Sequence, residues 1–192
     1  GVPELRAALA TYSSALYDVP IGEDRITVTA SGMSAMMLAH QLLIEPGSNI
    51  VCPTPQWPNV KGTVDVLGGD FRSVPLNFTG DDWELDLDAL CAAVDDKTRM
   101  IFVNSPGNPT GWVMPKEQQK RLLQYCREQG LWLVADEVYA RIVYGMKHAP
   151  SFLEHAKSDD RLIVINSFSK PWAMTGWRLG WLTTPGRLGG RL

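Results

Sequence analysis

Apolar positions recur along the chain at two spacings, one typical of helices and the other of buried strands. From Leu5 to Leu16 they follow one another at intervals of three and four residues, which predicts a helix with one buried face. The sequence predicts further helices over 34–43, a short stretch after 58, 87–94 and 115–129. Asp86 directly precedes residues 87–94 and is the expected N-cap of that helix.

Short apolar runs lie between these helices and predict strands over 26–29, 49–52, 71–76, 100–103, 131–135 and 162–165. Runs such as 100–103 are apolar at every position, which is typical of a parallel sheet covered on both faces. Strands and helices that alternate at this spacing are joined by right-handed crossovers. The pattern therefore predicts one α/β domain over residues 1–192, a doubly wound, mostly parallel sheet with helices on both faces.

Residues that carry chemistry follow five of the predicted strands, at 31–32, 55–57, 104–111, 136–139 and 167–170. The carboxyl ends of parallel strands gather at one edge of a sheet, and ligands of doubly wound sheets bind at that edge. We therefore expect these five segments to converge on one site.

The most informative segment is 167–180, in which Lys170 leaves a strand among hydroxyl and aromatic side chains. A partly desolvated lysine has a lowered pKa, so its neutral amine can form a Schiff base with an aldehyde. Ser167 and Arg178 would suit a phosphate group. The alternative is a solvated loop lysine, which is the usual state of a lysine taken alone.

Asp136 follows the apolar run 131–135, so it is expected where a buried strand opens onto the ligand edge. A buried carboxylate needs a cationic partner, and the protonated ring nitrogen of pyridoxal phosphate is one. The alternative is a helix N-cap for a segment that begins at Glu137.

Four further positions are weaker signals when taken singly. Gly32, ahead of the helix at Ser34, offers free backbone N–H groups and the positive end of a helix dipole to a phosphate. Trp57 is held among prolines and could stack on a ring, although core packing is the commoner role of a tryptophan. Asn108 and Tyr139 could donate hydrogen bonds to a ring oxygen, or be a turn asparagine and a half-buried helix tyrosine.

Composition and charge exclude several classes of partner. The 192 residues are 45% apolar, enough for a real core, and the net charge of −3 gives no basic field for nucleic acid or anionic membranes. No apolar run approaches the ~20 residues that span a bilayer. Three cysteines without a C-x-x-C pair argue against a disulfide framework or a metal site, so a cytoplasmic location is expected.

Together these motifs resemble the fold-type I pyridoxal-phosphate enzymes, in particular the class I/II aminotransferases. The resemblance rests on 167–180, on the Asn-Pro-Thr-Gly loop at 108–111 and on the Asp-Glu-Val-Tyr turn at 136–139, which match in order and spacing. It implies that Lys170 forms the Schiff base and shuttles the α-proton, while Asp136 pairs with the pyridine nitrogen. The other implied cofactor contacts are Trp57 by stacking, Asn108 and Tyr139 at the ring oxygen, and Met33, Ser34, Ser167, Ser169 and Arg178 at the phosphate.

The resemblance also sets expectations for the whole protein. It implies transfer of an amino group between an amino acid and a 2-oxo acid, by a homodimer. Family members are about twice as long, so we expect an N-terminal segment, a C-terminal small domain and the arginine for the substrate carboxylate outside this chain, and little activity from the chain alone. The Asn108–Pro109 peptide is expected to be cis.

Three alternatives stay open at the level of sequence. A lyase or another pyridoxal-phosphate enzyme of the same fold would have identical site residues. A transcription regulator could use the same module to sense a ligand without turning it over. A nucleotide-binding module of similar topology is disfavoured, because the glycine fingerprint of such modules is missing.

Overall fold

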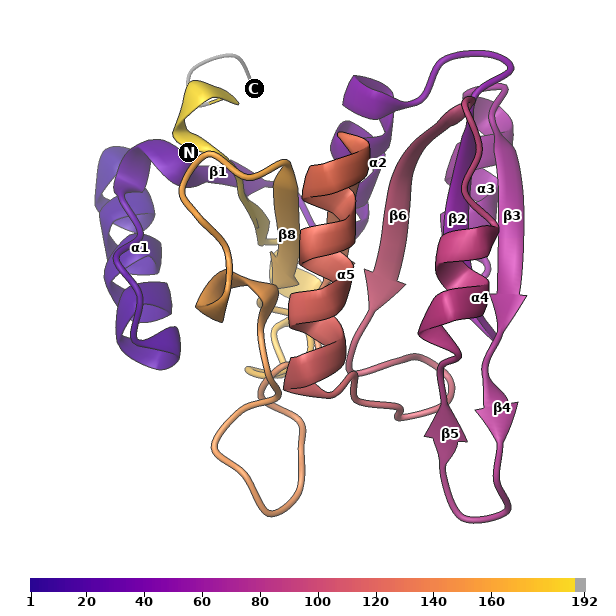
Figure 1. The fold of residues 1–192 in the computed structure, drawn as a ribbon. Helices are drawn as coiled ribbons and strands as arrows, with labels where there is room; N and C mark the ends of the chain where they lie inside the picture. The colour runs from indigo at the N-terminus through magenta and orange to yellow at the C-terminus, as the bar shows by residue number, and fades with distance from the viewer. Residues whose placement is uncertain (189–192) are drawn as a thin grey trace.

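The computed structural model describes residues 1–188 of the chain, in which helices and strands alternate (Figure 1). Five α-helices are described: α1 (Pro3–Tyr17), α2 (Gly32–Leu43), α3 (Asn59–Val66), α4 (Leu87–Ala92) and α5 (Lys116–Gln129). The main sheet contains β1 (Ile26–Thr29), β2 (Asn49–Thr54), β3 (Asp70–Pro75), β6 (Thr98–Asn104), β7 (Trp132–Asp136), β8 (Leu162–Ser167) and β9 (Gly180–Thr183). Two short strands, β4 (Asn77–Phe78) and β5 (Trp83–Glu84), form a separate hairpin.

The strands of the main sheet lie in the order β1-β9-β8-β7-β6-β2-β3. All neighbouring pairs are parallel except those of β9, which is antiparallel to both β1 and β8. The carboxyl ends of β2, β6, β7 and β8 therefore lie at the same edge. The mostly parallel α/β fold predicted from the sequence is confirmed.

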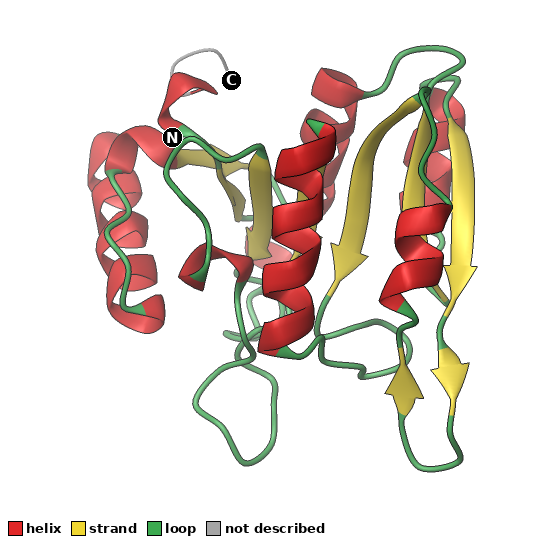
Figure 2. Cartoon of the chain, viewed as in Figure 1, coloured by secondary structure: helices red, strands yellow, loops and turns green. Residues whose placement is uncertain are grey.

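Two layers of helices cover the two faces of the sheet (Figure 2). One apolar cluster joins α1, α4 and α5 to one face, and the other joins α2 and α3 to the opposite face. Side chains of β6 alternate between them: Ile101 and Val103 belong to the first cluster, Met100 and Phe102 to the second. This double burial explains why the strand is apolar at every position.

Predicted and observed elements differ mainly at their ends. Strands β6, β7 and β8 extend to Asn104, Asp136 and Ser167, so each ends on a polar residue one or more positions beyond the predicted apolar run. The antiparallel strand β9 and the hairpin of β4 and β5 were not predicted. Asp86 caps α4 as expected, because its carboxylate accepts hydrogen bonds from the N–H groups of Asp88 and Ala89.

Within residues 1–188, none of the helices has the length and apolar character needed to cross a membrane. The domain predicted over 1–192 includes residues 189–192, which lie outside the described part of the chain.

Candidate active site

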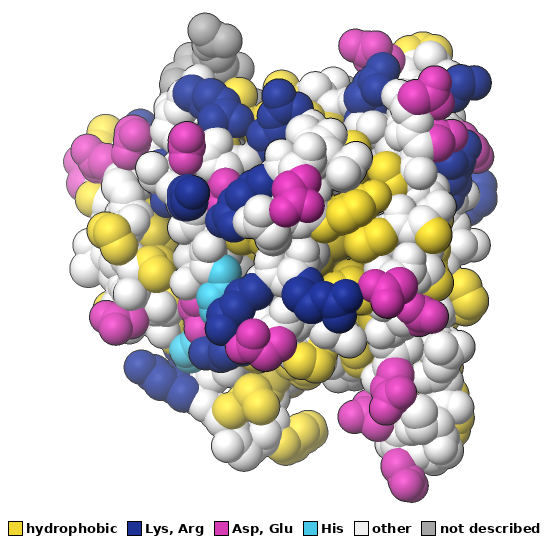
Figure 3. Space-filling model, in the orientation of Figure 1, with side chains coloured by type: hydrophobic (Ala, Val, Ile, Leu, Met, Phe, Trp, Pro, Cys, Tyr) yellow, Lys and Arg dark blue, Asp and Glu magenta, His cyan; other side chains and the backbone are white. Residues whose placement is uncertain are grey.

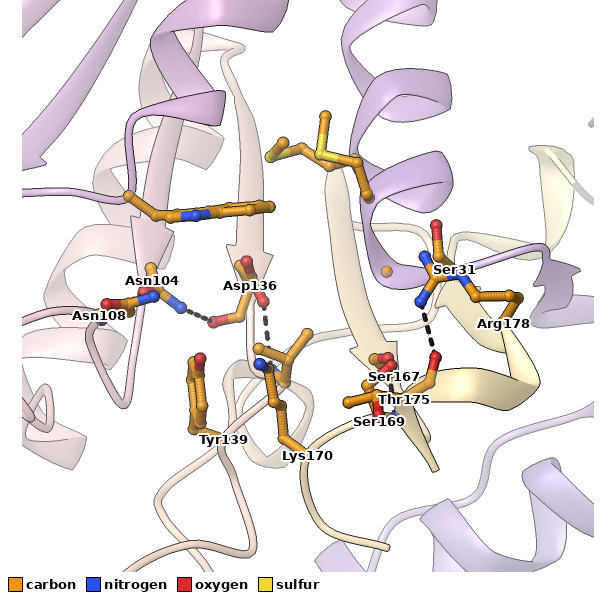
Figure 4. Close-up of a pocket in the computed structure, with 15 residues that line it drawn as sticks. Ser31, Asn104, Asn108, Asp136, Tyr139, Ser167, Ser169, Lys170, Thr175 and Arg178 are labelled. Carbon is orange, nitrogen blue, oxygen red and sulfur yellow. Dashed lines mark hydrogen bonds between the residues drawn. The ribbon is translucent and has the colours of Figure 1, made fainter. Parts of the chain in front are cut away.

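A cavity of about 280 Å³ lies at the carboxyl edge of the sheet, close to the lower end of the ~300–1,000 Å³ range of small-molecule sites. Figure 4 shows the side chains that point into it from several different elements. The lining residues are Ser31, Gly32, Met33, Met36, Trp57, Asn104, Asn108, Asp136, Val138, Tyr139, Ser167, Ser169, Lys170, Thr175 and Arg178. Of the ten predicted site residues, nine are in this set, and the exception is Ser34.

Lys170 stands on the loop that leaves β8, with its side chain exposed at the cavity. Its ammonium lies 5.8 Å from the centroid of the Tyr139 ring, within reach of a cation–π contact. Trp172 anchors this loop. The centroid of its ring lies 5.5 Å from that of Tyr12 on α1 and 5.3 Å from that of Phe168. This aromatic support fixes the point from which Lys170 enters the cavity.

Asp136 is the last residue of β7, and only 7% of it is exposed. Burial raises the pKa of its carboxyl from 3.8 to about 6, partly offset by a hydrogen bond of 3.2 Å from the Val138 N–H. No lysine, arginine or histidine within residues 1–188 forms an ion pair with it. The segment after Asp136 consists of turns, so the helix considered as the alternative is absent from it.

The amino end of α2 faces the cavity, but the residues that line the cavity there are not all those that were predicted. The helix begins at Gly32, and Ser31 is its N-cap: the Ser31 hydroxyl accepts a hydrogen bond of 2.9 Å from the Ser34 N–H. Ser34 is exposed and does not line the cavity, and its amide is engaged in this cap. The first-turn amides of Gly32 and Met33 have no acceptor within the helix, so they and Ser31 replace Ser34 at this edge of the cavity.

The strand pairing places the residues of segment 167–180 beside this helix end. Gly180 opens β9 and pairs with both Thr29 of β1 and Ser167 of β8. The Ser167 hydroxyl donates to the Leu179 carbonyl over 3.3 Å and accepts from the Ser169 N–H over 3.1 Å. A Cβ added to Gly32 would approach that of Ser167 to 3.2 Å, so the helix end and the strand end are closely packed.

Arg178 completes this side of the cavity. Its backbone is left-handed, with φ of 54°, and its guanidinium donates to the Thr175 carbonyl over 2.9 Å. Figure 4 shows the guanidinium on the same side of the cavity as Ser31 and Ser167. Arg178 forms no ion pair with the carboxylates of residues 1–188, so its charge faces the cavity without an internal counterion.

Asn108, Tyr139 and Trp57 line the same cavity. The Asn108–Pro109 peptide is cis, as predicted, and the Asn108 N–H donates to the Asn104 side-chain oxygen over 2.8 Å. Tyr139 lies half-buried in a turn rather than in a helix. Trp57 is half-buried and packs against the apolar cluster behind α2 and α3, so it combines core packing with a place in the cavity wall.

Five lining residues received no individual role from the sequence, although the first three lie in segments that were expected to converge on the site: Ser31, Asn104, Val138, Met36 and Thr175. The rule that a serine before a helix is its N-cap could have identified Ser31 in place of Ser34. A polar residue directly after the apolar run 100–103 was the available signal for Asn104. Nothing in the sequence distinguishes Met36 from the other apolar residues of α2.

The fold and the cavity together define an α/β domain with an amine, a buried carboxylate and a helix amino end around one cavity at the carboxyl edge of the sheet. The family model for aminotransferase class I and II matches residues 1–188, and the chain belongs to this family. The resemblance stated from the sequence motifs is therefore confirmed.

Known relatives give the same result. The chain is 34% identical over 188 residues to a probable aspartate aminotransferase of Methanocaldococcus jannaschii, covering 98% of this chain and 48% of the relative. A valine–pyruvate aminotransferase of Mycobacterium tuberculosis is 32% identical, with 96% and 47% covered. Among solved structures, aspartate aminotransferase from Thermotoga maritima has a TM-score of 0.90 at 29% identity, covering 98% of this chain and 50% of that one. The chain thus spans about half the length of the relatives it matches.

Proposed function

We propose that this chain is the pyridoxal-phosphate-binding large domain of an aminotransferase, which moves an amino group between an amino acid and a 2-oxo acid. The observation that carries the proposal is the arrangement of Lys170, Asp136 and the amino end of α2 around one cavity. These elements come from three separate strand ends, and each supplies a different group that this cofactor requires.

The charges of the cavity match those of the cofactor. Asp136 is a buried carboxylate without an ion-pair partner in residues 1–188, and a protonated ring nitrogen would compensate its charge. At another part of the wall, the first-turn amides of α2, the helix dipole and the Arg178 guanidinium all favour an anion such as phosphate. Trp57 contributes an aromatic surface for a planar ring.

When bound, pyridoxal phosphate supplies an aldehyde that reacts with amines and a protonated ring that accepts electrons from the substrate α-carbon. Lys170 would supply the amine that holds the cofactor, and its Nζ would be the group that moves the α-proton of the substrate. Asp136 would keep the proton on the ring nitrogen. Asn108 and Tyr139 would hold the ring oxygen, while Ser31, Ser167, Ser169, Arg178 and the amides of Gly32 and Met33 would hold the phosphate.

We propose the substrates only as a class, amino acids and 2-oxo acids. The names of related proteins range from aspartate aminotransferase to valine–pyruvate aminotransferase, and one Escherichia coli structure at 27% identity is described as having a methionine aminotransferase function. We propose a homodimer as the active assembly of the whole protein, as the family resemblance implies. A cytoplasmic location stays a prediction of the sequence.

Reduction of the protein with borohydride after incubation with pyridoxal phosphate, followed by peptide mapping, tests the proposal. We expect a pyridoxyl label on Lys170 and on none of the other six lysines. Lys170→Ala should still bind the cofactor non-covalently, because the phosphate contacts are unchanged, but should lose α-proton transfer by ~10²- to 10⁴-fold or more.

Lys61→Ala is the matched control, because Lys61 lies on α3 in an exposed ion pair with Asp65. It should leave both labelling and turnover unchanged. A label on a lysine other than Lys170 would remove the proposed role of this site.

A further inference from the structure

Asn104 occupies a position in the cavity wall that the proposed function leaves unassigned. It ends β6, only 7% of it is exposed, and its side chain lines the cavity. Polar side chains at such depth are normally hydrogen-bonded, and the partners of this one show what it holds in place.

Both ends of the Asn104 amide are engaged, and with different segments. The side-chain nitrogen donates to the Asp136 backbone carbonyl over 3.0 Å (Figure 4), and the side-chain oxygen accepts from the Asn108 N–H over 2.8 Å. The first partner is the end of β7, and the second is the loop between β6 and α5. The carboxamide offers a donor on one atom and an acceptor on another, and it places no charge beside the Asp136 carboxylate.

We propose that Asn104 is a positioning residue, which holds the Asn108 loop against the end of β7 so that Asn108 and Asp136 grip two edges of one bound ring. The inference rests on the proposed function, because Asn108 and Asp136 are its candidate ligands for the ring oxygen and the ring nitrogen. Asn104 itself acts through these two residues.

A second buried asparagine provides a matched control at the opposite edge of the same sheet. Asn49 opens β2 and is 1% exposed, and its amide also bridges two partners, donating to the Asp95 carboxylate over 2.8 Å and accepting from the Thr98 hydroxyl over 2.7 Å. Loss of either asparagine removes two hydrogen bonds, one of them fully buried. Only Asn104 connects residues of the cavity.

The experiment compares Asn104→Ala with Asn49→Ala in the protein loaded with pyridoxal phosphate. We expect both variants to lose thermal stability. Only Asn104→Ala should lower kcat, by about 10- to 100-fold, because small misplacements of reacting groups have effects of that size. It should also raise the pKa of the bound pyridoxal phosphate by about one unit, since a displaced Asn108 would no longer stabilise the negative ring oxygen.

A measurement without the cofactor separates this inference from the proposed function. Hydrogen exchange at the Asn108 amide should become faster in cofactor-free Asn104→Ala and remain slow in Asn49→Ala. If Asn104→Ala does not fold, Asn104→Ser takes its place in every comparison. Unchanged exchange at Asn108, or a pKa of the bound pyridoxal phosphate and a kcat equal to those of Asn49→Ala, would overturn the role of Asn104, whereas absence of any label on Lys170 would overturn the proposed function instead.

Discussion

Asp136 shows a conflict between folding and function at a single residue. Its carboxyl lies almost entirely out of water, and among residues 1–188 it forms no ion pair. Burial therefore raises its pKa from 3.8 in the unfolded chain to about 6 in the folded one. A raised carboxyl pKa means that the ionised group destabilises the fold, and this destabilisation is fully present only above about pH 6.

Asp136→Asn should therefore stabilise the cofactor-free protein in a pH-dependent manner. The rise of the pKa from 3.8 to about 6 corresponds to roughly 3 kcal/mol, so the variant should gain up to that amount at pH 8. The gain should disappear as the pH falls from 6 towards 4. The amide oxygen can still accept the Val138 N–H, so little else changes. Urea unfolding of both proteins at pH 5 and pH 8 measures the difference.

With saturating pyridoxal phosphate at pH 8, the unaltered protein should become more stable than Asp136→Asn. The Asp136 carboxylate then gains its cationic partner, so the ligand stabilises the native state of the unaltered protein more strongly than that of the variant. A stability gain of equal size at pH 5 and pH 8 would show that the Asp136 carboxyl is not desolvated.

Between neighbouring elements, the strand β9 determines how close α2 comes to the sheet. A Cβ on Gly180 would lie 2.5 Å from the Gly32 nitrogen and 2.9 Å from the Asn166 carbonyl oxygen, both of which are backbone atoms. Such atoms cannot rotate away, so only glycine allows the start of β9 and the start of α2 to meet. The anion cradle depends on this contact, because it sets where the amides of α2 lie relative to Ser167.

Gly180→Ala should therefore displace the amino end of α2. We expect a loss of about 1–3 kcal/mol in the free energy of unfolding, as for other overpacked sites, and at least tenfold weaker binding of pyridoxal phosphate. Gly176→Ala in the same segment is the control: no atom lies within 4 Å of its added Cβ, so stability should change by less than about 0.5 kcal/mol. Equal cofactor affinity in the two variants would contradict the proposed contact.

The sequence predicted elements well where one physical cause dominates. β6 has a long apolar run because both its faces are buried, and α5 shows a clear helical period. β9 was missed because its four residues, Gly-Trp-Leu-Thr, follow a long irregular segment and become a strand only by pairing with β1 and β8. The hairpin of β4 and β5 was missed for a similar reason, since each strand has two residues.

The candidate site was predictable where sequence motifs contain its residues. It was not predictable where contacts between segments far apart in the chain determine which residues line the cavity. Lys170, Asp136 and Asn108 were identified by chemistry and motif, and the structure brings them to one cavity. Ser34 was predicted as a site residue because the sequence predicts a helix that begins there, whereas α2 begins two residues earlier, at Gly32. Glu137 lies in the same motif as Asp136, yet its carboxylate turns away to accept hydrogen bonds from the Ser151 hydroxyl and the Phe152 N–H.

At the scale of the whole molecule, the open cavity is continuous with an exposed apolar surface. A groove of about 500 Å³ shares Asn108 and Tyr139 with the cavity and runs along the loop that follows β7. On this loop Ile142, Tyr144 and Met146 are 47%, 96% and 51% exposed. Figure 3 shows hydrophobic side chains gathered on the protruding loop. Contiguous apolar surface of this kind is typical of a protein interface.

The purified 192-residue chain should consequently self-associate through this loop. Replacing Ile142, Tyr144 and Met146 by serine removes the apolar area without adding a charge, so the weight-average mass in sedimentation equilibrium should fall towards that of the monomer, 21.2 kDa. Val66→Ser is the matched control, because Val66 is 77% exposed on α3 and lies outside the groove. It should leave the association unchanged. An unaltered chain that stays monomeric at ~100 μM, well above the micromolar range of weak interfaces, would exclude this surface as a site of self-association.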